Sequence, residues 1–267
     1  MRWRPASATI GGEMTEGTWL LGAAWAALAG AAGGSAIGVV AERWGTGARL
    51  FWGRSRCEEC GVVLGIRDLV PVVSYLLLRG RCRRCRAPIP LRLWALELSG
   101  AALGVVLWSR WRWDGEYLAG AALLGVLLAC AAVDLRRQVI PNGLVALGAL
   151  VALAGAPWGP GLASAALGAG VGLGAMLAWH IAARGALGGG DIKLALVLGL
   201  ALGFPGVLVA LLLAVAGGAA IVGALWALGR VRRRALVPFG PFLVAGGIVA
   251  WLEGEAALAW YLGLWRA

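Results

Sequence analysis

Residues 194–228 read LALVLGLALGFPGVLVALLLAVAGGAAIVGALWAL, an apolar sequence interrupted only around Phe204, Pro205 and Gly206. A helix needs about 20 apolar residues to cross a bilayer. The stretch is therefore long enough for two short spans, residues 194–204 and 206–228, or for one long span with a re-entrant piece. The number of spans here fixes the orientation of everything that follows in the chain.

The composition of the whole chain indicates a helical membrane protein. Of 267 residues, 61% are hydrophobic and 14% are charged, and the mean hydropathy is +0.83. A backbone that meets lipid must satisfy its own hydrogen bonds, which a helix does. We therefore expect an all-α polytopic membrane protein with about eight transmembrane helices, at residues 19–41, 93–109, 117–133, 143–156, 161–183, 194–204, 206–228 and 242–262.

The distribution of basic residues supports eight spans. Loops rich in Lys and Arg stay cytoplasmic, and with the first span running outside to inside, 19 of the 24 basic residues fall in cytoplasmic segments. Those segments are residues 42–92, 134–142, 184–193 and 229–241. The net charge of +11 accompanies no nucleic-acid module, so we expect membrane lipids, and no nucleic acid, as partners of these arginines.

The sequence divides into three parts: residues 1–41 with the first transmembrane helix, a cytoplasmic region at 42–92, and a transmembrane domain at 93–267. The cytoplasmic region contains four of the five cysteines as two Cys-x-x-Cys pairs, separated by 21 residues and formed by Cys57, Cys60, Cys82 and Cys85. This spacing is close to that of a zinc ribbon. In a reducing compartment it predicts a structural Zn²⁺ site with four thiolate ligands. Redox-active Cys-x-x-Cys pairs are the alternative.

Two aspartates stand out because the chain has only four, at positions 68, 114, 134 and 191. Asp134 and Asp191 each lie where an apolar segment meets a short cytoplasmic loop, and acids at membrane depth are usually functional. Taken singly, each has a plain interpretation. Asp191 would favour the positive end of a helix dipole, and Asp134 would pair with Arg136 or Arg137.

Taken together, the two acids fit peptide hydrolysis. Such hydrolysis needs one ionised carboxylate to activate water and one protonated carboxyl to hydrogen-bond the scissile carbonyl. Asp134 is followed by Ile140-Pro141-Asn142, and Asp191 follows Gly188, Gly189 and Gly190. Glycines allow an extended substrate backbone to approach closely.

In combination these residues resemble the bacterial prepilin leader peptidases of type IV pilus and type II secretion systems. The resemblance spans most of the chain. It rests on the double Cys-x-x-Cys loop, on Glu97 in Trp-Ala-Leu-Glu-Leu, on the two aspartate motifs, and on Pro238-Phe239-Gly240-Pro241-Phe242.

The resemblance implies a membrane-embedded aspartyl endopeptidase of the inner membrane that removes the short basic leader from prepilins and pseudopilins at the cytoplasmic face. It implies that Asp134 and Asp191 are the catalytic pair. We expect a substrate groove beside them, with backbone contributions from Gly188, Gly189, Gly190, Pro141, Pro238 and Gly240.

Many members of this family also methylate the new N-terminus with S-adenosylmethionine. By that resemblance Asp68 and Glu97 are candidate cofactor-binding residues in this chain. At the end of the first span, where family members have Gly-Ser-Phe-x-Asn-Val, this chain reads Gly-Ser-Ala-Ile-Gly-Val from Gly34 to Val39.

Two other classes of function compete with this interpretation. An ion- or proton-coupled transporter would use inner-face acids and glycine breaks, and it predicts acids nearer mid-span and an internal repeat. A purely structural membrane scaffold would leave the paired aspartates unexplained.

Overall fold

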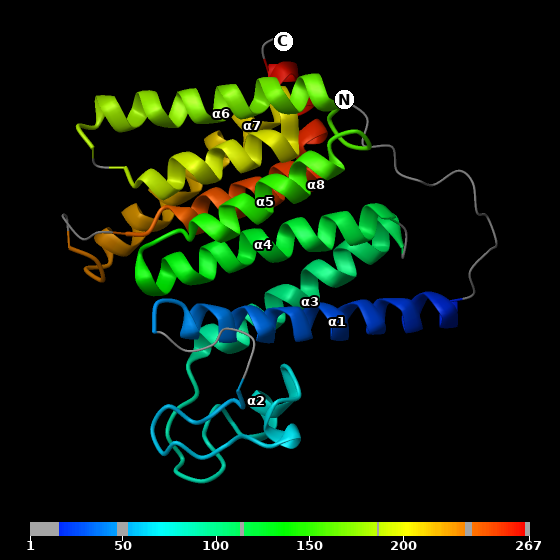
Figure 1. Cartoon of the computed structure of the whole chain (residues 1–267), viewed down its shortest axis with the longest axis vertical. Helices are drawn as coiled ribbons and strands as arrows, with labels where there is room; N and C mark the ends of the chain where they lie inside the picture. Colours follow the sequence, from blue (N-terminus) through cyan, green and yellow to red (C-terminus); the bar gives the residue numbers. More distant parts are fainter. Residues whose placement is uncertain (1–15, 47–52, 113–114, 186, 233–236, 265–267) are drawn as a thin grey trace. The chain divides into compact units, whose positions relative to one another are not determined.

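The computed structural model describes residues 16–46, 53–112, 115–185, 187–232 and 237–264, and their ordered elements are helical (Figure 1). The chain forms two compact units that meet inside one helix, between Gly125 and Val126. The expected division at residues 41 and 92 follows composition rather than packing, and it stays a prediction. Each unit is described separately below.

The first unit pairs α1 (Glu16–Arg43) with α3 (Leu91–Trp111) and also holds the loop region between them. The two helices touch through small residues: a Cβ added to Gly30, Gly34, Gly100 or Gly104 would collide with the backbone of the facing helix. Small residues four apart allow such close approach in membranes. The glycine spacing in the first span is therefore explained by packing.

The loop region contains a 3-10 helix, η1 (Ile66–Asp68), and the short helix α2 (Val73–Leu77). Isolated bridges join Arg56 to Val63 and Arg81 to Pro88. Each bridge flanks one Cys-x-x-Cys pair.

The second unit contains the C-terminal half of α4 (Gly115–Arg137), followed by α5 (Asn142–Gly155), α6 (Leu162–Ala182), α7 (Gly189–Ala227) and α8 (Gly240–Leu264). Helix α7 packs against α5, α6 and α8 and supplies much of the core of this unit. Where α6 crosses α7, a Cβ at Gly168 would lie 2.5 Å from the Gly199 carbonyl oxygen and 2.6 Å from the Gly203 carbonyl carbon.

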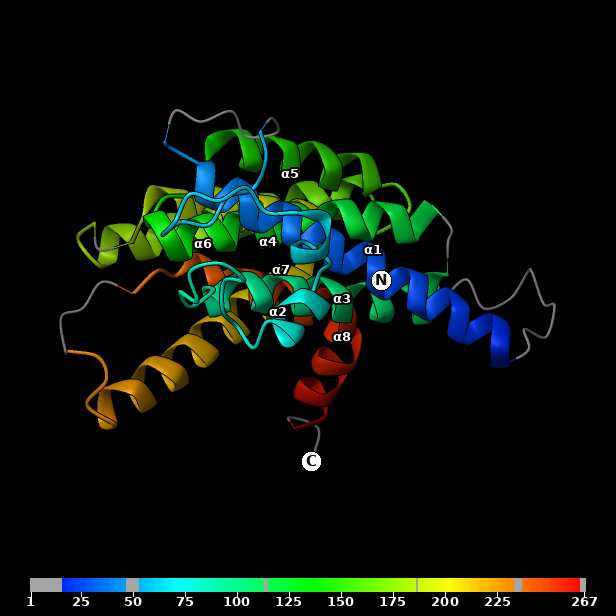
Figure 2. The ribbon, with the colours of Figure 1, turned by 90° about the horizontal axis from the view of Figure 1, so that it is seen from below.

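Helix α7 is broken where the sequence analysis placed an interruption. Gly203 has φ +63° and Phe204 has an extended backbone, and Pro205 follows. The Ser164 Oγ donates to the Phe204 carbonyl and accepts from the Phe204 N–H, each at 3.1 Å. A hydroxyl from the neighbouring helix thus satisfies backbone groups that the break releases. Figure 2 shows the second half of α7, in orange, running in a new direction.

The expected all-α polytopic fold is confirmed. Five described helices are long and apolar enough to cross a membrane, and two shorter apolar helices occupy Asn142–Gly155 and Gly240–Gly254. If the two halves of α7 are counted separately, these helices correspond one by one to the eight expected spans. The helices extend beyond the apolar runs, so that Asp134 lies in the last turn of α4 and Asp191 in the first turn of α7, rather than in the adjoining loops.

The α6–α7 crossing predicts that alanine substitution lowers the stability of the protein at one glycine of α6 and not at a glycine two residues away. Gly168→Ala should destabilise the protein by about 1–3 kcal/mol because its Cβ meets backbone that cannot move aside. Gly170→Ala is the control, since a Cβ there meets nothing within 4 Å, and it should leave stability unchanged or slightly raised. Thermal unfolding in detergent measures both, and equal midpoints would contradict the crossing.

Candidate functional site

The four cysteines of the loop region form one cluster. Their sulfur atoms all lie within 4.8 Å of one another, and the Cys57 and Cys85 sulfurs are 3.8 Å apart. A tetrahedral ion with metal–sulfur distances of about 2.3 Å separates its ligand sulfurs by about 3.8 Å. The arrangement therefore fits a metal ion held by four thiolates.

The two cysteine pairs have the same backbone geometry. The N–H of Cys57 donates to Val62 O and the N–H of Gly61 donates to Cys57 O; the second pair repeats both bonds with Ala87, Cys82 and Arg86. Gly61 and Arg86 occupy equivalent positions and both have positive φ, +67° and +62°. In the second loop, N–H groups of Cys85 and Arg84 point to the Cys82 sulfur and lower the pKa of this thiol to about 6. That favours the thiolate of Cys82, the form that binds metal, whereas burial and the neighbouring sulfurs raise the pKa of Cys85 to about 12.

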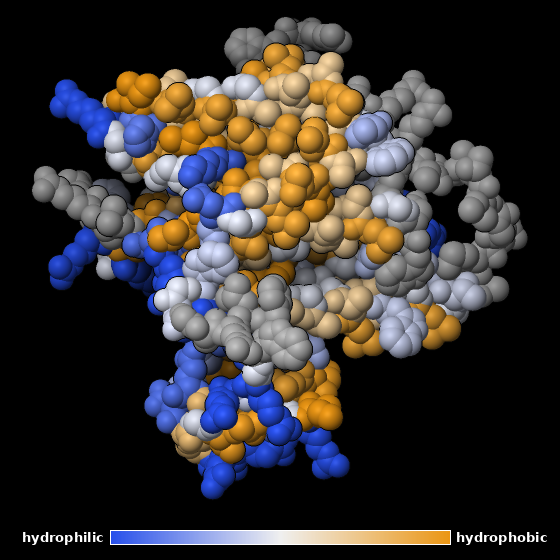
Figure 3. Space-filling view, in the orientation of Figure 1, coloured by the Kyte–Doolittle hydropathy of each residue, from blue (hydrophilic) through white to orange (hydrophobic). Residues whose placement is uncertain are grey.

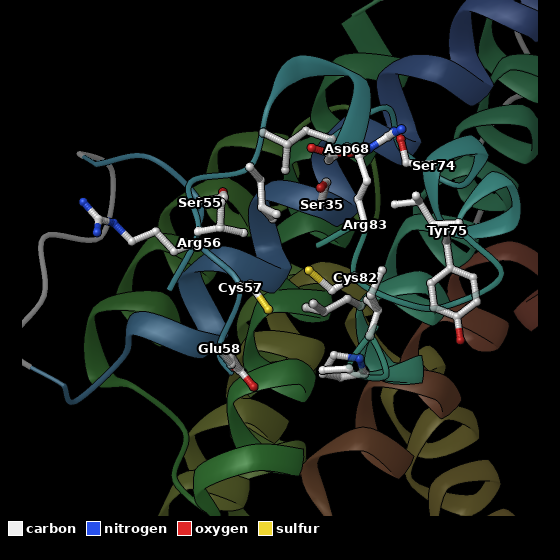
Figure 4. A pocket seen from close by; sticks show the side chains of 18 of the residues that line it. Ser35, Ser55, Arg56, Cys57, Glu58, Asp68, Ser74, Tyr75, Cys82 and Arg83 are labelled. Carbon is white, nitrogen blue, oxygen red and sulfur yellow. Dashed lines mark hydrogen bonds and ion pairs between the residues drawn. The ribbon is translucent and has the colours of Figure 1, made fainter. Parts of the chain in front are cut away.

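A cavity of about 600 Å³ lies between this loop region and the facing parts of α1 and α3, and it is large enough for a small organic cofactor. Figure 4 shows Ser35 of α1 beside Cys57, Cys82, Asp68 and Arg83 around this pocket. Asp68 and Glu97, the two expected cofactor-binding acids, both line it. The structure thus brings together residues 29 positions apart in the sequence.

Asp68 and Glu97 have different local partners. Asp68 Oδ1 accepts a 2.7 Å hydrogen bond from Arg83 Nε. This bond lowers the pKa of the Asp68 carboxyl, and the N–H of Gly65 acts in the same direction. Glu97 Oε2 accepts from the N–H of Val72 at 2.7 Å.

Val72 is strained. It has φ +63° and ψ −50°, and the N–H of Val73 bonds to Pro71 O at 2.6 Å, which makes a γ-turn of the rare type with positive central φ. A β-branched residue avoids this conformation. The bond to Glu97 helps hold the turn against the cavity wall.

Two aromatic rings complete the cavity. Tyr75 of α2 stacks on Trp94 of α3 with centroids 5.5 Å apart. The Trp94 Nε1 is buried and has no hydrogen-bond partner. A buried donor without a partner is costly.

A second site forms in the other unit around Asp134 and Asp191, at the ends of α4 and α7. Among the residues that the structure describes, these are the only charged side chains that are buried, 6% and 8% exposed. Asp134 Oδ2 accepts a hydrogen bond from the N–H of Gly240 at the start of α8, at 3.0 Å.

Ile140 connects the surroundings of the two acids. A Cβ at Gly190 would lie 2.9 Å from Ile140 Cβ, and a Cβ at Gly240 would lie 2.7 Å from Asp134 Oδ2 and 3.2 Å from Ile140 Cδ1. Gly190 and Gly240 are therefore needed for close packing at the site. Both acids are approached by backbone that carries no side chain.

The other expected groove residues have different surroundings. Gly188 is the N-cap of α7, and a Cβ there would lie 3.1 Å from Asp191 Oδ2, whereas a Cβ at Gly189 would meet nothing within 4 Å. Pro141 is the buried N-cap of α5. Pro238 is half-buried and lies two residues before Gly240.

Two polar residues support the loops beside the acids. Lys193 Nζ donates to Asn142 Oδ1 at 2.9 Å, which joins the first turn of α7 to the first turn of α5. His180 Nδ1 lies 2.8 Å from the Leu187 carbonyl oxygen, just before the glycine run. This contact ties the end of α6 to the loop before α7.

Some residues of these sites could not be identified from the sequence. Gly240 was expected in a groove, but its N–H was not expected as the partner of Asp134, because that contact joins residues 106 positions apart. Tyr75, Trp94 and Arg83 were not expected as cavity residues. The many arginines in 42–92 were the available signal, but arginines beside membrane spans have a simpler explanation as anchors.

Two family models match parts of this chain. Residues 28–111 match the bacterial peptidase A24 N-terminal domain, and residues 121–223 match the type IV leader peptidase family. No solved structure matches this chain.

Several relatives are named prepilin leader peptidase/N-methyltransferase. The chain is 39% identical to that of Burkholderia pseudomallei strain 1026b, over 73% of this chain and 65% of the relative. It is 31% identical to that of Bacillus subtilis strain 168, over 78% of this chain and 85% of the relative. It is 33% identical to that of Aeromonas hydrophila, over 78% of this chain and 74% of the relative. The chain thus spans just under two thirds of the Burkholderia relative.

The cysteine cluster predicts stoichiometric metal binding. The purified chain should contain one metal ion, and the double variant Cys57→Ser with Cys85→Ser should lose it, because two weak ligands replace two thiolates. Cys130→Ser is the matched control, since Cys130 is buried in α4 outside the cluster. Elemental analysis by plasma mass spectrometry measures all three proteins; metal retained in the double variant would refute the site.

Proposed function

This chain belongs to the type IV leader peptidase family, and from that premise we propose that it is a membrane-embedded aspartyl endopeptidase acting on prepilins and pseudopilins. It cuts off the short basic leader at the cytoplasmic face of the bacterial inner membrane. The single observation that supports this best is the pair of buried carboxyl groups of Asp134 and Asp191 at the ends of α4 and α7.

The geometry suits acid–base hydrolysis of a peptide bond. The Gly240 N–H fixes one oxygen of Asp134, so that carboxyl is held in place before substrate binds. One acid of the pair activates water as the base, and the protonated acid hydrogen-bonds the scissile carbonyl and then protonates the leaving amine. The exposed glycines 188 and 189 leave room beside Asp191 for an extended substrate backbone.

The position of the acids also fits such a substrate. Both lie within one turn of a helix end, where a peptide bond just outside an apolar substrate helix would be presented. The transporter alternative expected acids nearer mid-span, and neither the structure nor the comparisons support it. A structural scaffold leaves two buried acids without a role.

The cysteine cluster is proposed to hold Zn²⁺ as a structural ion. Cys57, Cys60, Cys82 and Cys85 would bind it and leave no open coordination position. The loop region has few buried apolar residues, so cross-linking its two hairpins through a metal would replace a hydrophobic core.

A second activity, N-methylation of the new N-terminus with S-adenosylmethionine, is favoured by the cavity of the first unit. The cofactor would supply an activated methyl group when bound. The residues present fit it: the Glu97 carboxylate complements a positive charge, and the Tyr75–Trp94 pair with the unpartnered Trp94 Nε1 suits a flat heteroaromatic ring. The ordered γ-turn at Val72 holds Glu97 in one orientation.

The peptidase proposal is tested with Asp134→Asn and Asp191→Asn. Each variant should lose at least about a hundredfold in cleavage of a co-expressed prepilin, because an amide can neither accept nor deliver the required proton. Leu135→Ala is the control, since Leu135 is next to Asp134 but 63% exposed on the helix surface. Wild-type cleavage by either asparagine variant, inserted normally in the membrane, would disprove the pair.

The methylation proposal is tested on a pseudopilin that has already been cleaved, with a radiolabelled methyl donor. Glu97→Gln keeps an acceptor for the Val72 N–H but removes the charge, so it should lose methyl transfer while leader cleavage continues. Glu97→Ala should in addition destabilise the loop region. Failure of the wild-type chain to transfer methyl would remove this activity and leave the peptidase proposal intact.

A further inference from the structure

The loop region carries an exposed apolar surface, most of which lies outside the cavity and both proposed sites. Its large side chains, the 66–77 patch, are Ile66, Leu69, Val70, Val73, Leu76 and Leu77. Ile66 is 87% exposed and Leu77 is 78% exposed. Figure 3 shows hydrophobic colour on the loop region on the side where Figure 1 places α2. Contiguous exposed apolar surface of this kind marks a place of interaction.

The position of the patch along α1 and α3 indicates what covers it. Val72 bonds to Glu97 and Tyr75 stacks on Trp94, so the patch lies beside the first two turns of α3. The same cavity reaches Ser35, eight residues before the end of α1, which is roughly 12 Å along a helix. The loop region is therefore folded back along the two helices rather than extended beyond them.

The position of the 66–77 patch along α1 and α3 corresponds to the edge of the bilayer. Both α1 and α3 are apolar enough to span a membrane. A helix of 28 residues is about 42 Å long, against about 30 Å of hydrocarbon. Because α1 ends in the charged residues Glu42 and Arg43, its last turn belongs in the headgroup layer. A patch one to two turns inside the helix ends meets the boundary between headgroups and acyl chains.

The charges around the patch suit the same environment. Arg67 lies within it and Arg79 follows it directly, and both are exposed. The one acid in the segment, Asp68, is bound to Arg83 and its side chain is only 17% exposed. An apolar face edged by arginines is the pattern of interfacial membrane segments on anionic lipid.

We propose that the 66–77 patch inserts into the cytoplasmic leaflet, with Arg67 and Arg79 on the phosphates of anionic phospholipids. Leu69 and Val70 belong both to the patch and to the lining of the 600 Å³ cavity. Insertion therefore places one wall of the cavity at the lipid surface. A polypeptide end that leaves the membrane then reaches the cavity along that surface. The proposal concerns the partner of this surface and holds whether or not the cavity binds a methyl donor.

The test uses the full chain in lipid nanodiscs of phosphatidylethanolamine and phosphatidylglycerol. The photo-crosslinking residue p-benzoylphenylalanine replaces Leu77 in one variant and Glu59 in the other. Both positions are exposed in the same loop region, and Glu59 lies on the first cysteine hairpin. An unchanged metal content confirms that each variant is folded.

After illumination, mass spectrometry should find phospholipid attached at position 77 and none at position 59. Crosslinks from position 77 to a second copy of the chain or to an added prepilin, or the absence of any lipid adduct, would overturn the proposal. Substituting glutamine for both Arg67 and Arg79 should lower the share of phosphatidylglycerol among the adducts. An unchanged share would refute the contact with anionic headgroups.

Discussion

The structure depends on close backbone contact between helices that are apolar on every side. Lipid tails are as apolar as leucine, so burial of leucine gives little drive for association within the membrane. The helices associate instead where glycine removes the side chain, as between Gly30 and Gly100 or between Gly168 and Gly199. The same rule governs the break in α7, because the backbone released at Phe204 must find partners inside the protein and finds them in Ser164.

Both sites are built on this frame. Two carboxyl groups are tolerated among apolar helices because they lie at helix ends, where backbone N–H groups such as that of Gly240 are free to bind them. The glycines that allow helices to approach also keep side chains away from the acids. The loop region between α1 and α3 has no comparable core, and its order comes from two matching cysteine hairpins, from the Glu97–Val72 bond and from stacking of Tyr75 on Trp94.

Periodicity and composition predicted the helices well but not their ends. The apolar run stops at Val133, yet α4 continues to Arg137, since a polar side chain does not end a helix whose backbone bonds are still satisfied. Asp134 was therefore expected beside a helix and lies within one. The break near Phe204 was visible because proline and glycine act locally. The Glu97–Val72 contact was not visible, because it depends on how a loop folds back over 25 residues.

The sequence alone determined the class of protein, the approximate spans, the cysteine cluster and the pair of aspartates, because these follow from hydropathy, charge and short-range spacing. The catalytic role of that pair is still a prediction. Only the tertiary structure decided which groups surround them: Gly240 on Asp134, Ile140 between the two glycines, and a cavity shared by α1, α3 and the loop region. The physical reason is that hydrophobic patterning is the same for many arrangements of apolar helices, whereas each polar contact at these sites requires one particular arrangement.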